Sequence, residues 1–253
     1  MGIPVSLPEF GEQPVTDKPR HSVLADAFQS AAEKILSGRS IDDAEKAGIF
    51  SATAYGPLDI YSFNAKTLYT RGVRGLRAQV SAQSVLCEPS CLTGVKLKMK
   101  AVNNTIIGGK TASFQAFAAA SDAFYSDMGE AFLVIGGDIC GEKAYAGAVL
   151  MGSISGDMTV NGIINRFAPD PGMIPDMEKE IALELTRLAG HDPYILTGCR
   201  REFSHETIEG TDTCAAFFEG LKRVRVLMVS ESRSIIYIDS DKSGAVSGIL
   251  ITA

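Results

Sequence analysis

The residues best suited to chemistry in this sequence are Ser113 and the histidines. A serine hydroxyl becomes a nucleophile at neutral pH only when a base within about 3 Å accepts its proton, and histidine is the usual base. The chain has three histidines, of which His191 and His205 fall in the part that we expect to fold around Ser113. Ser113 paired with His191 or with His205 could transfer or hydrolyse an acyl group. Spacing alone does not identify the carboxylate that would orient the histidine.

Ser113 stands at the head of a segment that is typical of a buried helix. Residues 111–128 are mostly small, so few side chains project and another backbone can approach closely. The following run Ala131–Ile135 (AFLVI) is apolar on both faces, which predicts a central strand of a covered sheet. We expect this strand to end in a tight turn at Gly136, Gly137 and Asp138.

The rest of the chain alternates between helical and strand patterns. Helices are expected at Ser22–Ser37, Met177–Leu188 and around Cys214–Leu221, and strands at Ala47–Thr53, Ala146–Met151, Tyr194–Thr197, Val224–Val229, Ser234–Ile238 and Ser247–Thr252. This alternation indicates an α/β architecture. The prolines of residues 1–21 predict an extended arm, because proline interrupts both helices and ladders.

The segment around Ser113 resembles the nucleophile segment of the β-ketoacyl synthases. Thr111, Ala112 and Ser113 fall on the Thr-Ala-Cys triplet that opens a buried helix in that family, and Gly136 and Gly137 fall on its paired glycines. More weakly, the stretches 47–56, 210–213 and 243–250 resemble the first strand, the Gly-Thr-Gly-Thr turn and the last strand of these enzymes. The resemblance runs from about residue 23 to the C-terminus and is specific around residues 104–138.

The resemblance implies a shortened thiolase-like fold, in which two fused α/β halves stack in five layers. It divides the chain into an N-terminal arm, residues 1–21, and a ketosynthase-like domain, residues 22–253, with halves at approximately 22–165 and 170–253. It also implies a dimer formed through the strand next to the nucleophile. Phe114 and Phe117 are then core or dimer-contact residues, or they shape a tunnel together with Gly136 and Gly137.

The chemistry of condensation lacks its reacting groups in this sequence. The family uses a cysteine thiolate, which attacks the acyl thioester, and two histidines that assist decarboxylation. Ser113 replaces the cysteine, Glu209 stands where the first histidine precedes its turn, and residues 224–238 contain no histidine for the second. We therefore expect no independent condensing activity, and we expect the missing length around 224–238 and in the loops that cap the acyl tunnel.

Two functions from different classes remain open. The favoured one is a chain-length-factor-like subunit of a type II fatty-acid or polyketide system, which would pair with an active ketosynthase or with itself and meet an acyl carrier protein. The alternative is an acyltransferase or thioester hydrolase that uses Ser113, with His205 as its base, on carrier-bound acyl groups.

Composition narrows the setting. The net charge of −6 and the pI near 5.2 argue against nucleic-acid binding, because phosphate binding needs a basic face. Arg71, Arg74 and Arg77, and the lysines at 96, 98 and 100, are expected to be solvated surface charges. The N-terminus lacks the pattern of a signal peptide, and the five cysteines do not form a disulfide or zinc pattern. We expect a cytoplasmic protein without cofactor or metal, whose cysteines are reduced and mostly buried. The stretch Gly108–Thr111 lacks the glycine spacing of a phosphate-binding loop.

Overall fold

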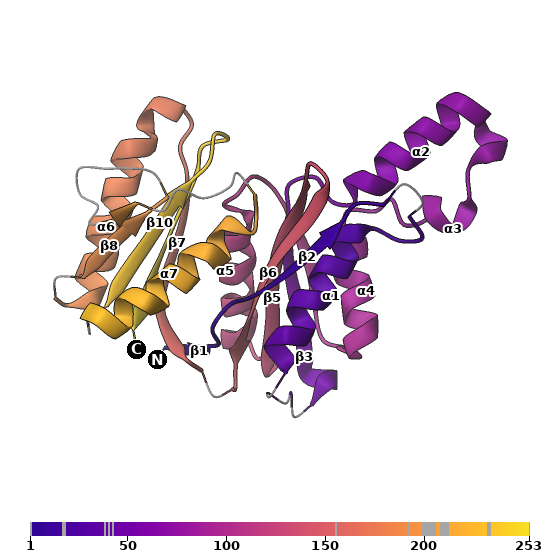
Figure 1. Ribbon diagram of the computed structural model, residues 1–253. Coiled ribbons are helices and arrows are strands. Elements are labelled where there is room, and N and C mark those ends of the chain that lie inside the picture. Colours follow the sequence, from indigo (N-terminus) through magenta and orange to yellow (C-terminus); the bar gives the residue numbers. More distant parts are fainter. Residues whose placement is uncertain are drawn as a thin grey trace.

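The chain folds into one mixed sheet with helices on its faces (Figure 1). The computed structural model describes residues 2–16, 19–37, 39, 41, 43–154, 156–191, 193–198, 206–207, 213–231 and 234–252. The first elements are β1 (Ile3–Val5), β2 (Glu9–Pro14), α1 (Val23–Leu36), η1 (Ala44–Lys46), β3 (Ala47–Thr53), α2 (Leu58–Arg71), η2 (Val73–Gly75), α3 (Ala78–Ser81), α4 (Glu88–Leu97), β4 (Asn103–Ile107), α5 (Ala112–Tyr125), β5 (Ala131–Cys140) and β6 (Lys143–Gly152). They are followed by β7 (Met158–Phe167), η3 (Pro171–Met173), α6 (Ile174–Ala189), β8 (Tyr194–Thr197), β9 (Glu206–Thr207), α7 (Ala216–Glu231), β10 (Ile235–Ser240) and β11 (Ala245–Thr252).

The strand order shows that the two halves repeat one topology. The sheet runs β4-β3-β5-β6-β1-β7-β11-β10-β8-β9, with β2 beside β6. Outward from the β1–β7 pair, each half has an antiparallel strand (β6 or β11) and then a hairpin partner (β5 or β10). Two parallel strands complete each half, β3 and β4 in the first and β8 and β9 in the second. The order is thus a palindrome about the β1–β7 seam.

The two halves of the sheet and the helices stack in five layers, as Figure 1 shows: a helical layer lies between the two halves and another covers the outer face of each half. The central layer holds α5 and α7, whose Phe114 and Phe217 rings have centroids 4.4 Å apart. Helix α5 packs against β3 and β5 of the first half and β7 and β11 of the second, while α7 packs against β10 and β6. Helices α1 and α4 cover the outer face of the first half, and α6 covers that of the second. The expected two-half α/β fold is confirmed.

The N-terminal segment is extended, but the expectation that its prolines keep it out of a ladder is wrong. Strand β1 pairs antiparallel with both β6 and β7, so it forms the seam between the halves. Strand β2 pairs with β6 along its whole length and ends at Pro14. Pro14 is tolerated because it ends β2, where its missing N–H is not needed by a neighbour. Pro4 lies inside β1, opposite Thr159 of β7.

Three other sequence expectations are corrected. Strand β5 does not end at Gly136 but continues through Asp138 to Cys140. Residues 224–229 belong to α7 rather than to a strand, because Val224, Leu227 and Met228 lie on one buried helical face. The cysteines are not mostly buried: Cys87, Cys91 and Cys140 are exposed, and of the described cysteines only Cys214 is buried.

The two halves differ most between their second and third strands. Residues 54–102, which include α2, α3 and α4, separate β3 from β4, whereas residues 198–205 alone separate β8 from β9. The sequence predicts missing length around residues 224–238, where the described residues form the end of α7, to Glu231, and β10, from Ile235. We propose that the halves divide in the connection from β6 to β7, earlier than the expected division near residues 165–170, and that β1 and β2 belong to the first half.

A buried pair of carboxyl groups holds the start of α1. Asp59 accepts hydrogen bonds from the Ser22 hydroxyl and the Val23 amide, both at 2.8 Å. Glu88 is buried, and its Oε1 accepts from the Ser22 amide at 3.2 Å while Oε2 has no partner within the described residues. Burial, opposed by the Ser22 hydrogen bond and reinforced by the charges of Asp59 and Asp26, raises the pKa of Glu88 to about 7.

This raised pKa predicts that Glu88→Gln stabilises the protein at alkaline pH. The ordinary pKa is 4.5, so the folded state binds the Glu88 proton more tightly than the unfolded state does. Native stability from this group is therefore complete below pH 4.5 and lost as pH rises through 7. Urea unfolding at pH 8.5 should show the variant more stable by about 2–3 kcal/mol, with little difference at pH 5. Glu142→Gln, at an exposed position, should change nothing at either pH. A gain for Glu88→Gln that is equal at both pH values would contradict the prediction.

Candidate functional site

Ser113 lies in the first turn of α5 and is fully buried between the two halves. Its Oγ donates a hydrogen bond to the main-chain carbonyl of Cys214, 2.5 Å away, just before α7. A carbonyl oxygen accepts a hydrogen bond but does not remove the proton, so this contact does not activate the hydroxyl. Ser113 therefore serves as a link between the two central helices.

The space around the Ser113 hydroxyl is filled by the opposite half of the chain. Gly136, on β5, leaves no room for a side chain: a Cβ there would collide with Ser113 Oγ and come within 3.1 Å of the Phe218 ring. Gly147, its partner across β6, would place a Cβ 2.5 Å from Phe218. Gly136 and Gly147 form a flat patch of sheet on which Phe218 of α7 rests.

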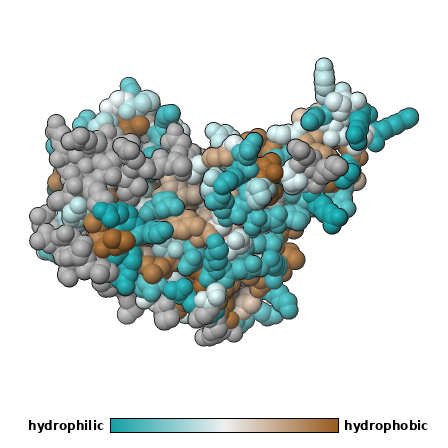
Figure 2. Space-filling view, in the orientation of Figure 1, coloured by the Kyte–Doolittle hydropathy of each residue, from teal (hydrophilic) through white to brown (hydrophobic). Residues whose placement is uncertain are grey.

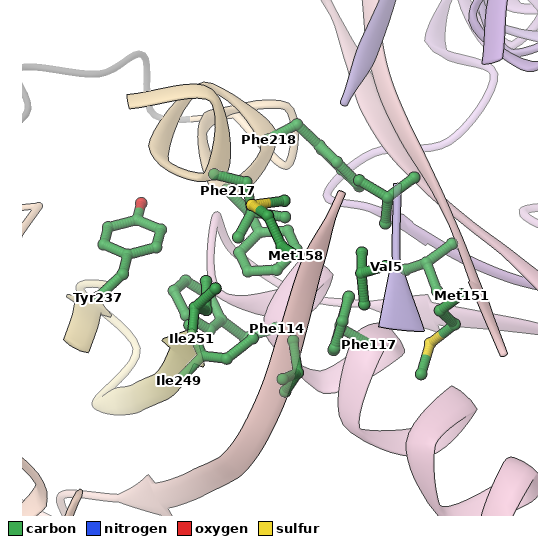
Figure 3. Packing of buried hydrophobic residues seen from close by; sticks show 14 of the residues in the cluster. Val5, Phe114, Phe117, Met151, Met158, Phe217, Phe218, Tyr237, Ile249 and Ile251 are labelled. Carbon is green, nitrogen blue, oxygen red and sulfur yellow. The ribbon is translucent and has the colours of Figure 1, made fainter. Parts of the chain in front are cut away.

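The other proposed site residues pack against the same helices. Phe114 is 1% exposed and lies between Phe217 and Tyr237, while Phe117 is fully buried against Phe217 (Figure 3). Gly137 lies one residue beyond Gly136, where a Cβ would come within 2.8 Å of Ala146 on β6. The structure thus brings Ser113, Phe114, Phe117 and Gly136 together in the core and places Gly137 beside them.

The histidines that are described lie away from Ser113. His21 bonds to Asp26, at 2.7 Å, at the start of α1. His191 is exposed just after α6, in the outer layer. His205, the predicted base, and Glu209 lie outside the described residues.

Cys214 is a buried thiol whose main-chain carbonyl binds Ser113, and its surroundings keep it protonated. Its Sγ points to the Gly109 carbonyl at 3.3 Å. Burial raises the pKa of the Cys214 thiol well above its usual range, and the carboxylates of Asp138 and Asp241 raise it further. A protonated, buried thiol is a poor nucleophile, so Cys214 does not take the place of the missing cysteine.

Asp138 joins the two halves at this point. It is 1% exposed, and its Oδ1 accepts from the Thr53 hydroxyl at 2.8 Å and the Ala54 amide at 2.7 Å, at the end of β3. Its Oδ2 accepts from the Cys214 amide at 2.9 Å. One carboxylate from the first half therefore fixes the start of α7 in the second half.

Asp239 makes the reciprocal connection from the second half to the first. Its Oδ1 pairs with Lys110 Nζ at 2.6 Å, and both side chains are largely buried. Burial raises the pKa of Asp239, although Lys110 opposes this effect by favouring the charged form. Lys110 is two residues before α5, as Cys214 is two residues before α7, so each aspartate reaches the start of the other half's central helix.

Asp241 adds a second contact on this side. Its Oδ2 accepts from the Thr111 hydroxyl at 2.5 Å. Burial alone would raise the pKa of Asp241, but hydrogen bonds from Ser243, Thr111 and the Ala245 amide outweigh it and lower the pKa. Thr111, the first residue of the triplet, is therefore engaged by the opposite half.

Sequence reasoning misses most of this polar network. It predicts only the end of a turn at Asp138, and it considers Lys110 only as part of a rejected phosphate loop. A signal is present in Asp239-Ser240-Asp241, where acidic residues end an apolar strand as Asp138 interrupts β5. The partners of these carboxylates are about 75–130 residues away in sequence, so no local pattern identifies them.

Solved structures of ketosynthases share this fold. The ishigamide ketosynthase/chain length factor has a TM-score of 0.80 at 14% identity, covering 93% of this chain and 82% of that chain. The type II polyketide ketosynthase of AntDE:AntF, bound to a hexaketide in complex with its acyl-carrier protein, has a TM-score of 0.77 at 13% identity and full coverage of both chains. A β-ketoacyl synthase from Burkholderia phymatum has a TM-score of 0.73 at 9% identity, covering 92% of this chain and 83% of that chain.

No family model and no curated protein matches this sequence. At the identities of the solved structures the likeness shows the fold alone. The fold expected from the Thr-Ala-Ser segment and the paired glycines, a shortened thiolase-like fold, is thereby confirmed.

The close contact of Gly136 with Ser113 predicts a measurable coupling. Gly136→Ala should destabilise the protein by about 1–3 kcal/mol, because the new methyl group overlaps Ser113 Oγ and crowds Phe218. Ser113→Ala alone should cost about 1 kcal/mol through its lost hydrogen bond. The double variant should be more stable than the sum of the single effects by about 0.5–1 kcal/mol, measured by urea unfolding. Gly172→Ala, at an exposed turn, is the control. Strict additivity would show that the methyl group and the hydroxyl do not meet.

Proposed function

We propose that this chain, which has the thiolase fold of the ketosynthases, is a non-condensing subunit of a type II fatty-acid or polyketide system that pairs with an active ketosynthase. The observation that carries the proposal is the environment of Ser113, whose hydroxyl is fully buried and bound to a main-chain carbonyl. A subunit freed from catalysis has no need of an exposed nucleophile at this position. In this proposal Ser113 only packs in the core and links the two central helices.

The descriptions of two neighbouring structures support the biosynthetic part of the proposal. One is a ketosynthase/chain length factor, and another is a ketosynthase in complex with its acyl-carrier protein. By analogy, we propose that this chain pairs with a ketosynthase and meets an acyl carrier protein in the cytoplasm. No helix in the described part of the chain is long and apolar enough to span a bilayer.

The alternative, an acyltransferase or hydrolase that uses Ser113, is less well supported. An acyl group must reach the hydroxyl, but Phe218, Gly136 and the Cys214 carbonyl fill the space around it. A base must also lie within about 3 Å of the hydroxyl, and its only hydrogen-bond partner in the described residues is that carbonyl. We propose that Phe114 and Phe117 fill the region beside Ser113 rather than line an open tunnel.

Strand β4 is the proposed pairing edge. It is joined to β3 on one side, and no other described strand pairs with it. The amides of Ile49 and Gly108 bond across the β3–β4 side, to Val102 and Thr53. The alternation of a parallel ladder then directs the amides of Asn103, Thr105 and Ile107 away from β3. An unpaired edge of this kind is a template for a strand of another subunit.

The non-condensing role predicts that no acyl group becomes attached to Ser113. Intact mass should show no adduct after the native chain, Ser113→Ala or Ser113→Cys is mixed with acyl- or malonyl-carrier protein. Ser113→Cys should also be less stable by about 1–3 kcal/mol, because sulfur is larger than oxygen and the site is full. The thiol that this substitution introduces should resist iodoacetamide in the folded protein and react after unfolding, which proves that it is present. An adduct on the native chain that disappears in Ser113→Ala would instead establish the acyltransferase.

The pairing edge predicts that Ile107→Pro prevents association while leaving the fold intact. Proline removes the outward amide of residue 107. Ile107→Ala keeps that amide and removes only the isoleucine side chain, so it is the matched control. With a tagged cysteine-bearing ketosynthase from the same biosynthetic system, the proline variant should lose at least tenfold in affinity and the alanine variant much less. Self-association, measured by analytical ultracentrifugation, tests the homodimer with the same pair. Equal affinity of the proline variant and the native chain would contradict pairing through β4.

A further inference from the structure

Helices α2 and α3 project from the body of the protein. Figure 1 shows them extending beyond α1 and α4, and Figure 2 shows the same projection in space-filling form, with hydrophilic side chains at its end. Residues 58–87, which we call the projection, contain only four buried residues: Asp59, Ile60, Thr67 and Val80. The protein's own core therefore accounts for little of this segment.

The projection is basic in an acidic chain, because its one acidic residue, Asp59, is buried at its base and only cations follow it. Between residues 60 and 87 the sequence has Lys66, Arg71, Arg74 and Arg77 and no aspartate or glutamate. This segment carries +4, and the remainder of the chain carries −10, which gives the total of −6. All four cations are exposed, and none forms an ion pair within the described residues. Their charge is not neutralised within the part of the chain that the structure describes.

The projection and the segment that leads from it to β4 also expose apolar side chains. Nine of the 18 exposed large hydrophobic residues in the described chain fall within residues 55–107. Tyr69 is 93% exposed, Val73 75% and Val95 77%. Scattered exposed apolar residues are ordinary, but here half of them lie in about a fifth of the chain, which is a higher density than elsewhere.

The base of the projection adjoins the β4 edge. Ser90, at the start of α4, lies 2.9 Å from the Thr105 hydroxyl on β4, and the Leu86 side chain packs against Gly56 at the other side of the base. Val95 on α4 and Ile107 on β4 also expose apolar side chains. A subunit bound along β4 would therefore lie next to the base of the projection.

We propose that the projection is a second docking element, which binds the ketosynthase-fold subunit paired through β4. The proposal rests on the pairing described under Proposed function. The partner surface must offer carboxylates to Arg71 and Arg74 and an apolar recess to Tyr69 and Val73. Continuity with β4 favours a protein partner over an anionic membrane, because one subunit can cover both the edge and the projection. The charges would speed and orient association, while the apolar residues at the tip would slow dissociation.

The test compares two projection variants with a matched control. Arg71→Glu/Arg74→Glu reverses the charge at the tip, and Tyr69→Ala/Val73→Ala removes its apolar side chains. Lys179→Glu/Arg187→Glu makes the same charge change on exposed positions of α6, in the outer layer of the other half. Binding to the tagged ketosynthase is measured by biolayer interferometry at low and high salt, after circular dichroism and urea unfolding confirm that each variant is folded.

Both projection variants should weaken binding about tenfold or more, and the α6 control should stay within about twofold. Charge reversal should act mainly on the association rate, with an effect that shrinks at high salt. If Ile107→Pro abolishes binding but both projection variants bind like the native chain, this proposal is overturned while pairing through β4 stands. If Ile107→Pro and the projection variants all bind like the native chain, the pairing itself is wrong. Co-flotation with phosphatidylcholine/phosphatidylglycerol vesicles that is lost in Arg71→Glu/Arg74→Glu, without any loss of ketosynthase binding, would assign the projection to membranes and overturn the proposal.

Discussion

The reciprocal contacts of Asp138 and Asp239 are the constraint on which the rest of the structure depends. Each carboxylate stands near the end of a central strand in one half and reaches the start of the central helix of the other half, at the Cys214 amide or at Lys110. Both are buried: loss of Lys110 would leave the charge of Asp239 uncompensated, whereas Asp138 is satisfied by hydrogen bonds from Thr53, Ala54 and Cys214. The two halves are consequently fixed in one relative position, and the packing of α5 on α7 follows from it.

This fixed position explains why Ser113 behaves as core. Because Asp138 fixes the start of α7, the Cys214 carbonyl lies within reach of the Ser113 hydroxyl and Phe218 rests on Gly136 and Gly147. The helix start that would lower a nucleophile's pKa in a condensing enzyme is present, but another helix covers it. The triplet stands at the start of this buried helix, and the Ser113 hydroxyl is not exposed.

The sequence predicted those parts of the fold that local patterns encode. The apolar run of β5, the small residues of α5 and the helical spacing of α1 and α6 indicated their elements, and the triplet with the paired glycines indicated the fold. Strand β7 was not predicted. Residues 224–229 were predicted as a strand although they belong to helix α7, because β-branched residues at helical spacing resemble a strand until tertiary packing selects one face. In the site, Ser113, Phe114, Phe117 and Gly136 were identified as neighbours, whereas Lys110 and Asp239 were not, since their contact joins segments far apart in the chain.

The place of β1 at the seam has a consequence for how the molecule is made. Residues 3–5 leave the ribosome before the rest of the sheet, yet their partners include β7, which begins more than 150 residues later. During early synthesis β1 can therefore pair only with β6, and its other side stays unpaired until β7 has been made. Folding of such a long-range pairing is slow, and the exposed edge is open to wrong partners in the interval. A chaperone, or a paired subunit already in place, would have its greatest effect at this stage.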